Sequence, residues 1–248
     1  MTREDIADIW IMSWGSKSRV AYALGKVKGQ GMISSIGGGI FLIGSRWGQI
    51  PRTSQWQKQE EISITTDNHY WQIVALLIRR YSPSGAIIAH EKSMEIHLRD
   101  YSIPGKLVLY TRDTEKRIRL GKYDIHFRTL KTWEKSGTRN MYRIFSDMSE
   151  ETMIDSVKVY YLSLESSLLD VASLRIHDSG IAEGLILRFL EKYASRLSRD
   201  ALGEFVKYRY IRALNRIRSL SKSHGFIDLY EDSLDIIRKE GGGCYLSL

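Results

Sequence analysis

Six histidines and one short acidic cluster are the side chains of this sequence that best suit catalysis or metal binding. His90 and His97 lie seven residues apart, a spacing too long for two ligands of one metal ion on a helix, where four is typical. Asp113, Glu115 and Lys116 combine carboxylates with a lysine, as metal-dependent nucleases do, but a solvated turn has the same composition. We therefore predict no catalytic residue, no metal site and no cofactor, and keep a nuclease-like site at these three residues as the alternative.

Other residues exclude further classes of site and partner. Gly37, Gly38 and Gly39 lack the surrounding GxxxxGK[ST] pattern of a phosphate-binding loop, so they predict the tip of a hairpin. Cys244 is the only cysteine, which excludes an internal disulfide and a cysteine-based zinc site and favours a reducing compartment. The longest apolar run, 71–78, contains a glutamine and is far too short to span a bilayer. With no signal-peptide segment at the start, these features predict a cytoplasmic protein without a membrane partner.

Positive charge is concentrated in parts of the chain. Thirty-seven Lys and Arg against 29 Asp and Glu give a net charge of +8 and a pI near 9.4. Between Asp8 and Glu60 there is no acidic residue. The basic residues of that stretch are Lys17, Arg19, Lys26, Lys28, Arg46, Arg52 and Lys58. A second acid-free stretch runs between Glu204 and Asp228. Clustered positive charge favours a polyanion, since each neutralised phosphate releases condensed counterions.

The first 46 residues show the element order of a winged helix-turn-helix domain. An apolar stripe at helical spacing in 2–13, a break at 14–16 and a second stripe in 16–28 predict two short helices. Two short apolar runs around the three glycines then predict a hairpin over 32–43. Such domains insert the second helix into the major groove and lay the hairpin along the backbone. The predicted DNA-binding residues are Ser16, Lys17, Ser18, Arg19, Tyr22, Lys26, Lys28 and Arg46. The alternative is a winged domain that contacts only proteins.

Residues 47–66 are predicted as a linker, and 67–240 as a larger α+β domain followed by a frayed tail at 241–248. In the linker, Trp47 and Trp56 indicate anchoring to a domain, and 62–64 is a candidate short strand. The larger domain begins with a helix to about residue 80, and 86–98 is apolar and then helical. Predicted strands are 106–112, 117–120, 123–130, 141–145 and 157–162, and predicted helices are 164–173, 181–196, 201–221 and 230–238. Strands in one block and helices in another indicate α+β rather than alternating α/β.

The helix predicted over 201–221 is basic as well as amphipathic. Its basic residues include Lys207, Arg209, Arg212 and Arg216, whereas Leu214 and Ile217 belong to an apolar side that faces the core. A solvated outer face is the default interpretation of such a helix. These four basic residues form a possible second DNA-facing surface, as a bent operator would require.

Two segments of the larger domain resemble the AbiEi family of antitoxins. The segment 83–98, PSGAIIAHEKSMEIHL, is similar to that family's Ser/Ala-His-Glu-Ser-Ala pattern followed by Leu-His. The segment 159–172, VYYLSLESSLLDVA, is similar to its strand followed by Glu-Arg/Lys-x-Leu-Leu-Asp. The strands at 106–111 and 123–128 also look like the family. Lys92 and Ser166 depart from its pattern. With the winged helix in front, the resemblance spans about 4–175.

Members of this family are winged-helix antitoxins and repressors of type IV toxin–antitoxin systems. The resemblance implies negative autoregulation, in which the N-terminal domain binds double-stranded DNA of its own promoter at the nucleoid. It also implies an antitoxin that acts against a cognate nucleotidyltransferase-like toxin without a stable complex, and that needs no cofactor. For His90 and Glu91 we favour a structural role, in which they begin a helix and tie it against the sheet by hydrogen bonds. The alternative function is a nucleic-acid-processing enzyme that a winged-helix domain recruits to DNA.

Overall fold

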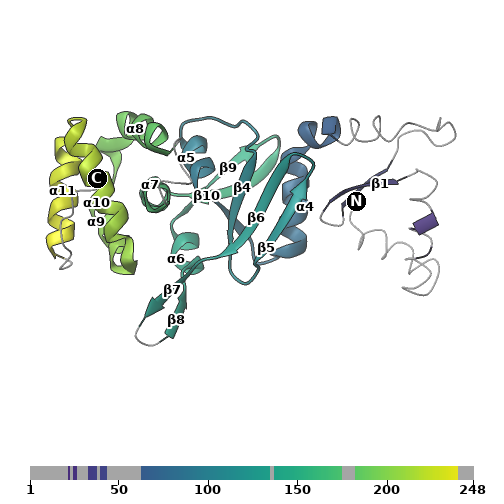
Figure 1. Cartoon of the computed structure of the whole chain (residues 1–248), viewed down its shortest axis with the longest axis horizontal. Coiled ribbons are helices and arrows are strands. Elements are labelled where there is room, and N and C mark those ends of the chain that lie inside the picture. The colour runs from purple at the N-terminus through teal and green to yellow at the C-terminus, as the bar shows by residue number, and fades with distance from the viewer. Residues whose placement is uncertain are drawn as a thin grey trace. The chain divides into compact units, whose positions relative to one another are not determined.

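A computed structural model describes residues 22, 25–26, 33–37, 40–43, 63–134, 137–174 and 182–239 of the chain (Figure 1). Most of the predicted winged helix-turn-helix domain, most of the predicted linker and the tail 241–248 lie outside the described residues. The described part combines helices with a mixed sheet, which confirms the α+β class.

A hairpin forms where the sequence predicts one in the N-terminal region. Strands β1 (Ile33–Gly37) and β2 (Ile40–Ile43) are antiparallel, and Ile33 pairs with Ile43. The register shifts between Ser35 and Gly37, next to the glycine-rich tip. The two helices predicted before this hairpin fall outside the described residues except at 22, 25 and 26, which are helical.

Six strands form one mixed sheet in the order β5-β6-β4-β3-β10-β9. They are β3 (Ala86–Ala89), β4 (Lys106–Thr111), β5 (Lys116–Leu120), β6 (Tyr123–Thr129), β9 (Ser149–Ile154) and β10 (Val157–Leu162). The central strands β3 and β4 are buried at almost every position, which explains why their sequences are nearly continuous apolar runs. The edge strands β5 and β9 expose charged residues instead. Strand β10 is parallel to β3 and antiparallel to β9.

By its contacts the chain divides into two compact units, and each is described by itself. Unit 1 comprises 1–83, 103–106 and 116–126. Its described core is helix α4 (Tyr70–Tyr81), which buries Tyr70, Trp71, Ile73, Val74 and Leu77. The ring of Tyr70 meets the ring of Tyr123 edge-on, with the centroids 5.0 Å apart. The bounds of α4 confirm the helix that the sequence predicts from near residue 70 to about residue 80.

The candidate strand at 62–64 is wrong, because residues 63–68 are helical. Three residues of alternating polarity are too few to separate a strand from one turn of a helix.

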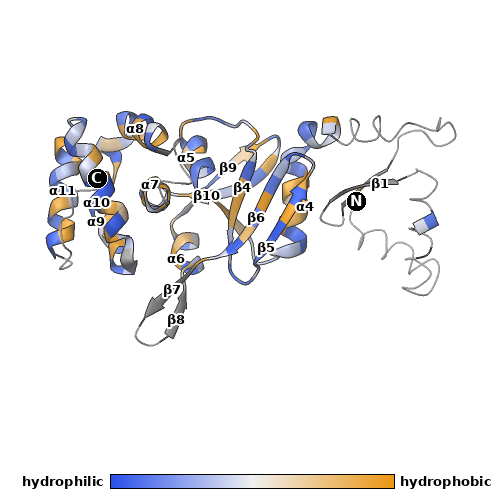
Figure 2. Cartoon of the chain, in the orientation of Figure 1, coloured by the Kyte–Doolittle hydropathy of each residue, from blue (hydrophilic) through white to orange (hydrophobic). Residues whose placement is uncertain are grey.

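Unit 2 comprises 84–102, 107–115 and 127–248, and holds most of the described helices. They are α5 (Glu91–His97), α6 (Tyr142–Asp147), α7 (Leu164–Ser173), α8 (Ala182–Tyr193), α9 (Arg199–Phe205), α10 (Ile211–Ser223) and α11 (Ile227–Lys239). The C-terminal helices carry both hydrophobic and hydrophilic residues, as amphipathic helices do (Figure 2). The single helix predicted over 201–221 is in fact α9 and α10, joined by the π-helical turn Val206–Tyr210.

Two further differences from the sequence prediction concern strands. The predicted strand 141–145 is wrong, because these residues lead into and form helix α6. Strand β9 and the two-stranded sheet of β7 (Lys131–Glu134) and β8 (Gly137–Asn140) were not predicted. Strand β9 turns into β10 through Asp155 and Ser156, whose φ angles of 47° and 64° suit a tight two-residue hairpin turn.

Candidate functional site

The two segments that resemble the antitoxin family lie side by side in unit 2. Each is a strand that leads into a helix: β3 into α5 in the first segment, and β10 into α7 in the second. The two strands are parallel neighbours, with Ile87 paired to Tyr160 and Ile88 to Tyr161. Because the two strands run in the same direction, α5 and α7 begin at the same end of the sheet, and the two helices pack against each other.

Buried polar groups join these two helices along what we call the α5–α7 seam: the side chains of Ser93 and His97 of α5, the backbone carbonyl of Leu162 of β10, and the side chains of Ser167 and Asp170 of α7. The hydroxyl of Ser167 donates to the carbonyl of Leu162 over 3.0 Å. The hydroxyls of Ser93 and Ser167 lie 2.7 Å apart. Because Ser167 donates its single hydroxyl hydrogen to Leu162, Ser93 is the donor of this pair. Nε2 of His97 lies 2.8 Å from the same Leu162 carbonyl oxygen. The seam thus fixes α5 against the strand that precedes α7.

Asp170, which is 1% exposed, links the seam to strand β4. Its Oδ2 accepts the backbone N–H of His90 over 2.8 Å, and its Oδ1 accepts the hydroxyl of Tyr110 over 2.5 Å. His90 has a φ of 57° and a ψ of −151°, a region that is costly for a residue with a Cβ atom. Burial, followed by the charge of Asp170, raises the pKa of Tyr110 well above 10. The carboxylate therefore holds the strained start of α5 and one strand of the sheet together.

The structure confirms that a helix begins at His90 and Glu91, whereas a tie through the side chain of Glu91 stays a prediction. His90 does begin α5, but its backbone N–H makes the tie, while its ring meets the ring of Tyr110 edge-on at 5.8 Å. No pattern in the sequence indicates Tyr110 as a partner. Both carboxylate oxygens of Asp170 already accept buried donors, so the seam suits positioning of the two helices rather than proton transfer.

His97 makes folding stability depend on pH near neutrality. The ring lies among Tyr161, Phe189 and Tyr193, and burial lowers its pKa below 6.5. Below pH 6.5 the unfolded chain therefore binds a proton that the folded chain resists, and stability falls as the pH falls. We expect the free energy of unfolding to decrease between pH 7 and pH 5, by at most about 1.4 kcal/mol per pH unit from this group. Urea titrations at both pH values measure it.

The matched variant is His97→Gln, which cannot titrate. Its free energy of unfolding should depend less on pH in this window than that of the wild type. The aspartates with lowered pKa values, Asp67, Asp100 and Asp124, titrate below 3.8 and so do not interfere. Equal pH dependence in the variant and the wild type would contradict the assignment.

Of the predicted DNA-binding residues, the structure describes two. Tyr22 and Lys26 are helical and exposed, and Tyr22 is 75% exposed. The remaining predicted residues, Ser16, Lys17, Ser18, Arg19, Lys28 and Arg46, lie outside the described residues.

The possible second basic surface, on the π-helical turn Val206–Tyr210 and on α10, is partly occupied by contacts within the chain. The ammonium group of Lys207 forms a 2.5 Å ion pair with Glu204, and Arg216 donates to the carbonyl of Leu174 over 3.3 Å. Arg212 is exposed, and the side chain of Arg209 lies outside the described part. A DNA phosphate at Lys207 or Arg216 would compete with these contacts.

The three residues considered for nuclease chemistry, Asp113, Glu115 and Lys116, each contact a different partner. Asp113 forms a 3.8 Å ion pair with Arg112, and Glu115 accepts the hydroxyl of Thr129 over 3.3 Å. The ammonium group of Lys116 lies 4.1 Å from the ring centroid of Tyr81. Within the described residues no group of three or more His, Cys, Asp or Glu could hold a metal ion. Nuclease-like chemistry thus stays an alternative based on the sequence.

Comparison with known proteins adds no family to this picture. No protein-family model matches the chain, and no curated protein matches it. Among the described helices, none is long and apolar enough to cross a membrane.

Proposed function

We propose that this protein is a sequence-specific DNA-binding transcriptional repressor that serves as the antitoxin of a type IV toxin–antitoxin system. The observation that carries the proposal is the stretch between Asp8 and Glu60, which has seven basic and no acidic residues. The hairpin β1–β2 falls inside this stretch, at the place of the wing in a winged helix. Such a charge distribution suits duplex DNA, whose phosphates supply most of the affinity.

The α5–α7 seam supports the antitoxin part of the proposal. Its two segments resemble the AbiEi family independently, and hydrogen bonds of Asp170 and Ser167 join them in unit 2. In this proposal the protein represses its own operon, opposes a nucleotidyltransferase-like toxin without a stable complex, and needs neither a cofactor nor catalytic residues.

The experiment that tests the proposal is a titration of the purified chain on its own upstream promoter DNA and on random duplex, each at two salt concentrations. We expect a steep loss of affinity with salt and a preference of about a thousandfold for the promoter. Binding without a preference would overturn sequence-specific repression. Absence of binding to both duplexes would overturn DNA binding altogether, and assays for cleavage and for protein partners would follow.

Variants within the predicted recognition helix should fall into two classes. Arg19→Ala or Tyr22→Ala should cost about 1–3 kcal/mol on the promoter and much less on random duplex, because these residues are assigned to base edges. Lys26→Ala or Lys28→Ala should weaken both duplexes similarly and reduce the salt slope by about one, because they are assigned to phosphates. Titration of the four variants on both duplexes measures this. Equal losses on both duplexes for all four would refute the assigned docking.

A further inference from the structure

The hairpin of β5 and β6 belongs to unit 1 and presents a basic face. Its segment 116–126 carries Lys116, Arg117, Arg119 and Lys122 against one acidic residue, Asp124. On β5, Ile118 and Leu120 are buried while Arg117 and Arg119 are exposed, as alternation along a strand requires. On β6, Tyr123 and Ile125 are buried, so Asp124 and His126 lie opposite them. We call Arg117, Arg119, Asp124 and His126 the β5–β6 face.

An ion pair organises the two arginines of this face. The guanidinium of Arg117 contacts both oxygens of Asp124, through Nη2 to Oδ2 at 2.5 Å and through Nε to Oδ1 at 3.4 Å. This pairing, helped by the charge of Arg119, lowers the pKa of Asp124 and keeps it ionised. Arg119 donates its Nε to the carbonyl of Gly121 over 3.3 Å, and it has no salt bridge within the described part of the chain. Among the described residues, the face thus carries one guanidinium in an ion pair, that of Arg117, and one without, that of Arg119.

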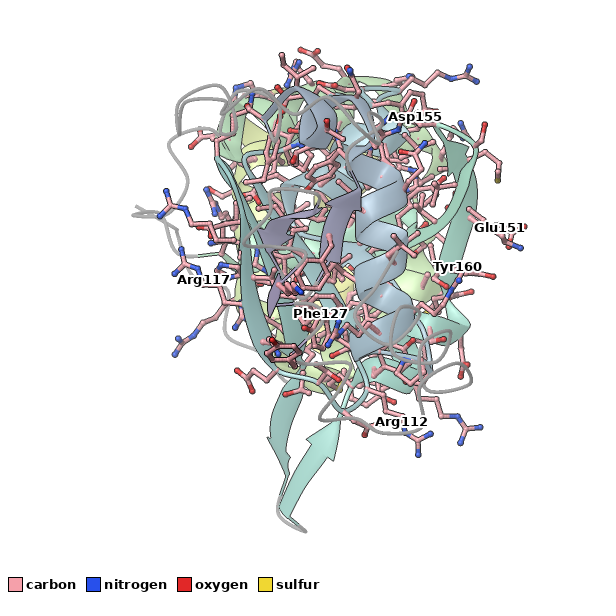
Figure 3. The ribbon with its side chains drawn as sticks, turned by 90° about the vertical axis from the view of Figure 1, so that its right-hand side faces the viewer. Arg112, Arg117, Phe127, Glu151, Asp155 and Tyr160 are labelled. Atoms are coloured by element: carbon pink, nitrogen blue, oxygen red, sulfur yellow. The ribbon has the colours of Figure 1, made fainter. Side chains whose placement is uncertain are left out.

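The two lysines of the same hairpin contact residues outside the β5–β6 face. The ammonium group of Lys122 donates to Asp67 over 2.8 Å, and that of Lys116 lies over the ring of Tyr81. Figure 3 shows the side chain of Arg117 pointing outward from the edge of the ribbon. The outward guanidinium of Arg117 is therefore open to an approaching partner.

We propose that the β5–β6 face binds the phosphate backbone of duplex DNA, through Arg119 directly and through Arg117 when Asp124 releases it. Alternate residues on a strand lie about 6.6 Å apart, comparable with the separation of neighbouring phosphates along a nucleic-acid strand. A planar guanidinium suits a phosphate because two of its N–H groups bind two oxygens at once. The proposal rests on the proposed DNA-binding function and adds a second, sequence-independent contact. Asp124 acts in it as a local counter-charge that limits affinity.

The test uses two variants of the full-length chain with opposite expected effects on DNA affinity. Both are titrated on random duplex at two salt concentrations. Arg119→Gln should weaken binding about five- to tenfold at 0.1 M salt and flatten the salt slope by about one, the effect of one lost phosphate contact. Asp124→Asn should strengthen binding severalfold and steepen the slope, because it frees the guanidinium of Arg117. The matched control is Arg143→Gln on α6, an exposed arginine whose side chain is 90% exposed, which should leave binding unchanged. Thermal unfolding curves confirm that each variant is folded.

The possible outcomes separate this inference from the proposed function. Opposite shifts for Arg119→Gln and Asp124→Asn, with Arg143→Gln unchanged, support the assignment. If the wild type binds DNA and both variants match it, or both shift in the same direction, the β5–β6 face is not a phosphate contact, while the proposed function stands. If the wild type binds no duplex, both fail.

Discussion

Replacing Asp170 by alanine is expected to lower the free energy of unfolding by about 2–5 kcal/mol. The change removes the acceptor of two buried donors, the backbone N–H of His90 and the hydroxyl of Tyr110. Neither donor can form a hydrogen bond with water instead, since His90 is 7% and Tyr110 is 2% exposed. Each unsatisfied donor costs about 1–3 kcal/mol, and His90 also loses the bond that holds its unfavourable backbone angles. Urea-induced unfolding of the variant and the wild type measures the loss.

A double-mutant cycle separates these hydrogen bonds from a general loss of packing. Tyr110→Phe in the Asp170→Ala background removes one stranded donor, so the double variant should lose less stability than the sum of the single losses. Asp170→Asn keeps an oxygen for His90 and offers an N–H group to the Tyr110 hydroxyl, and should cost less than alanine. Asp147→Ala, at an exposed aspartate of α6, is the control and should stay within about 0.5 kcal/mol. Strict additivity in the cycle would show that the two side chains act separately.

The sequence predicts elements best where local signals and burial agree. Strand β10 and helix α7 were predicted with their observed bounds, because a compact apolar run precedes Ser163, which caps the helix by accepting the N–H of Ser166. Strand β9 was missed because its sequence, SEETMI, reflects an edge position: Glu150, Glu151 and Met153 are exposed and only Ile154 is buried. An edge strand of this kind has no hydrophobic period to detect.

The candidate site could be predicted only in part. The histidine and serine patterns in 83–98 and 159–172 are visible in the sequence, but the bond from His90 to Asp170 joins residues 80 positions apart. Only the parallel pairing of β3 with β10 brings them together. The exposed basic face of the β5–β6 hairpin could not be predicted from composition, for a different reason. The acidic residues Asp113 and Glu115 precede it, so a count over a longer stretch hides the charge that β5 displays on one face.

Replacing Phe145 by alanine is expected to lower the free energy of unfolding by about 3–5 kcal/mol. Phe145 is 1% exposed, and its ring lies 5.6 Å from Tyr110, 5.3 Å from Phe205 and 6.3 Å from Tyr210. The truncation therefore removes a large side chain from the centre of the unit 2 core and leaves a cavity lined by aromatic rings. Urea-induced unfolding measures the loss, and Phe145→Leu, which fills more of the space, should cost clearly less.

The neighbouring Arg143 gives the matched control and explains the wrong strand prediction. Met141 and Phe145 share a face whether residues 141–145 are a strand or a helix, because four residues suit both periods. Arg143 decides between them: a strand would place it beside these two buried residues, whereas a helix turns it away. It is exposed in α6, so Arg143→Ala should change stability by less than about 0.5 kcal/mol. A loss below about 1 kcal/mol for Phe145→Ala, or a large loss for Arg143→Ala, would contradict the position of α6 against the core.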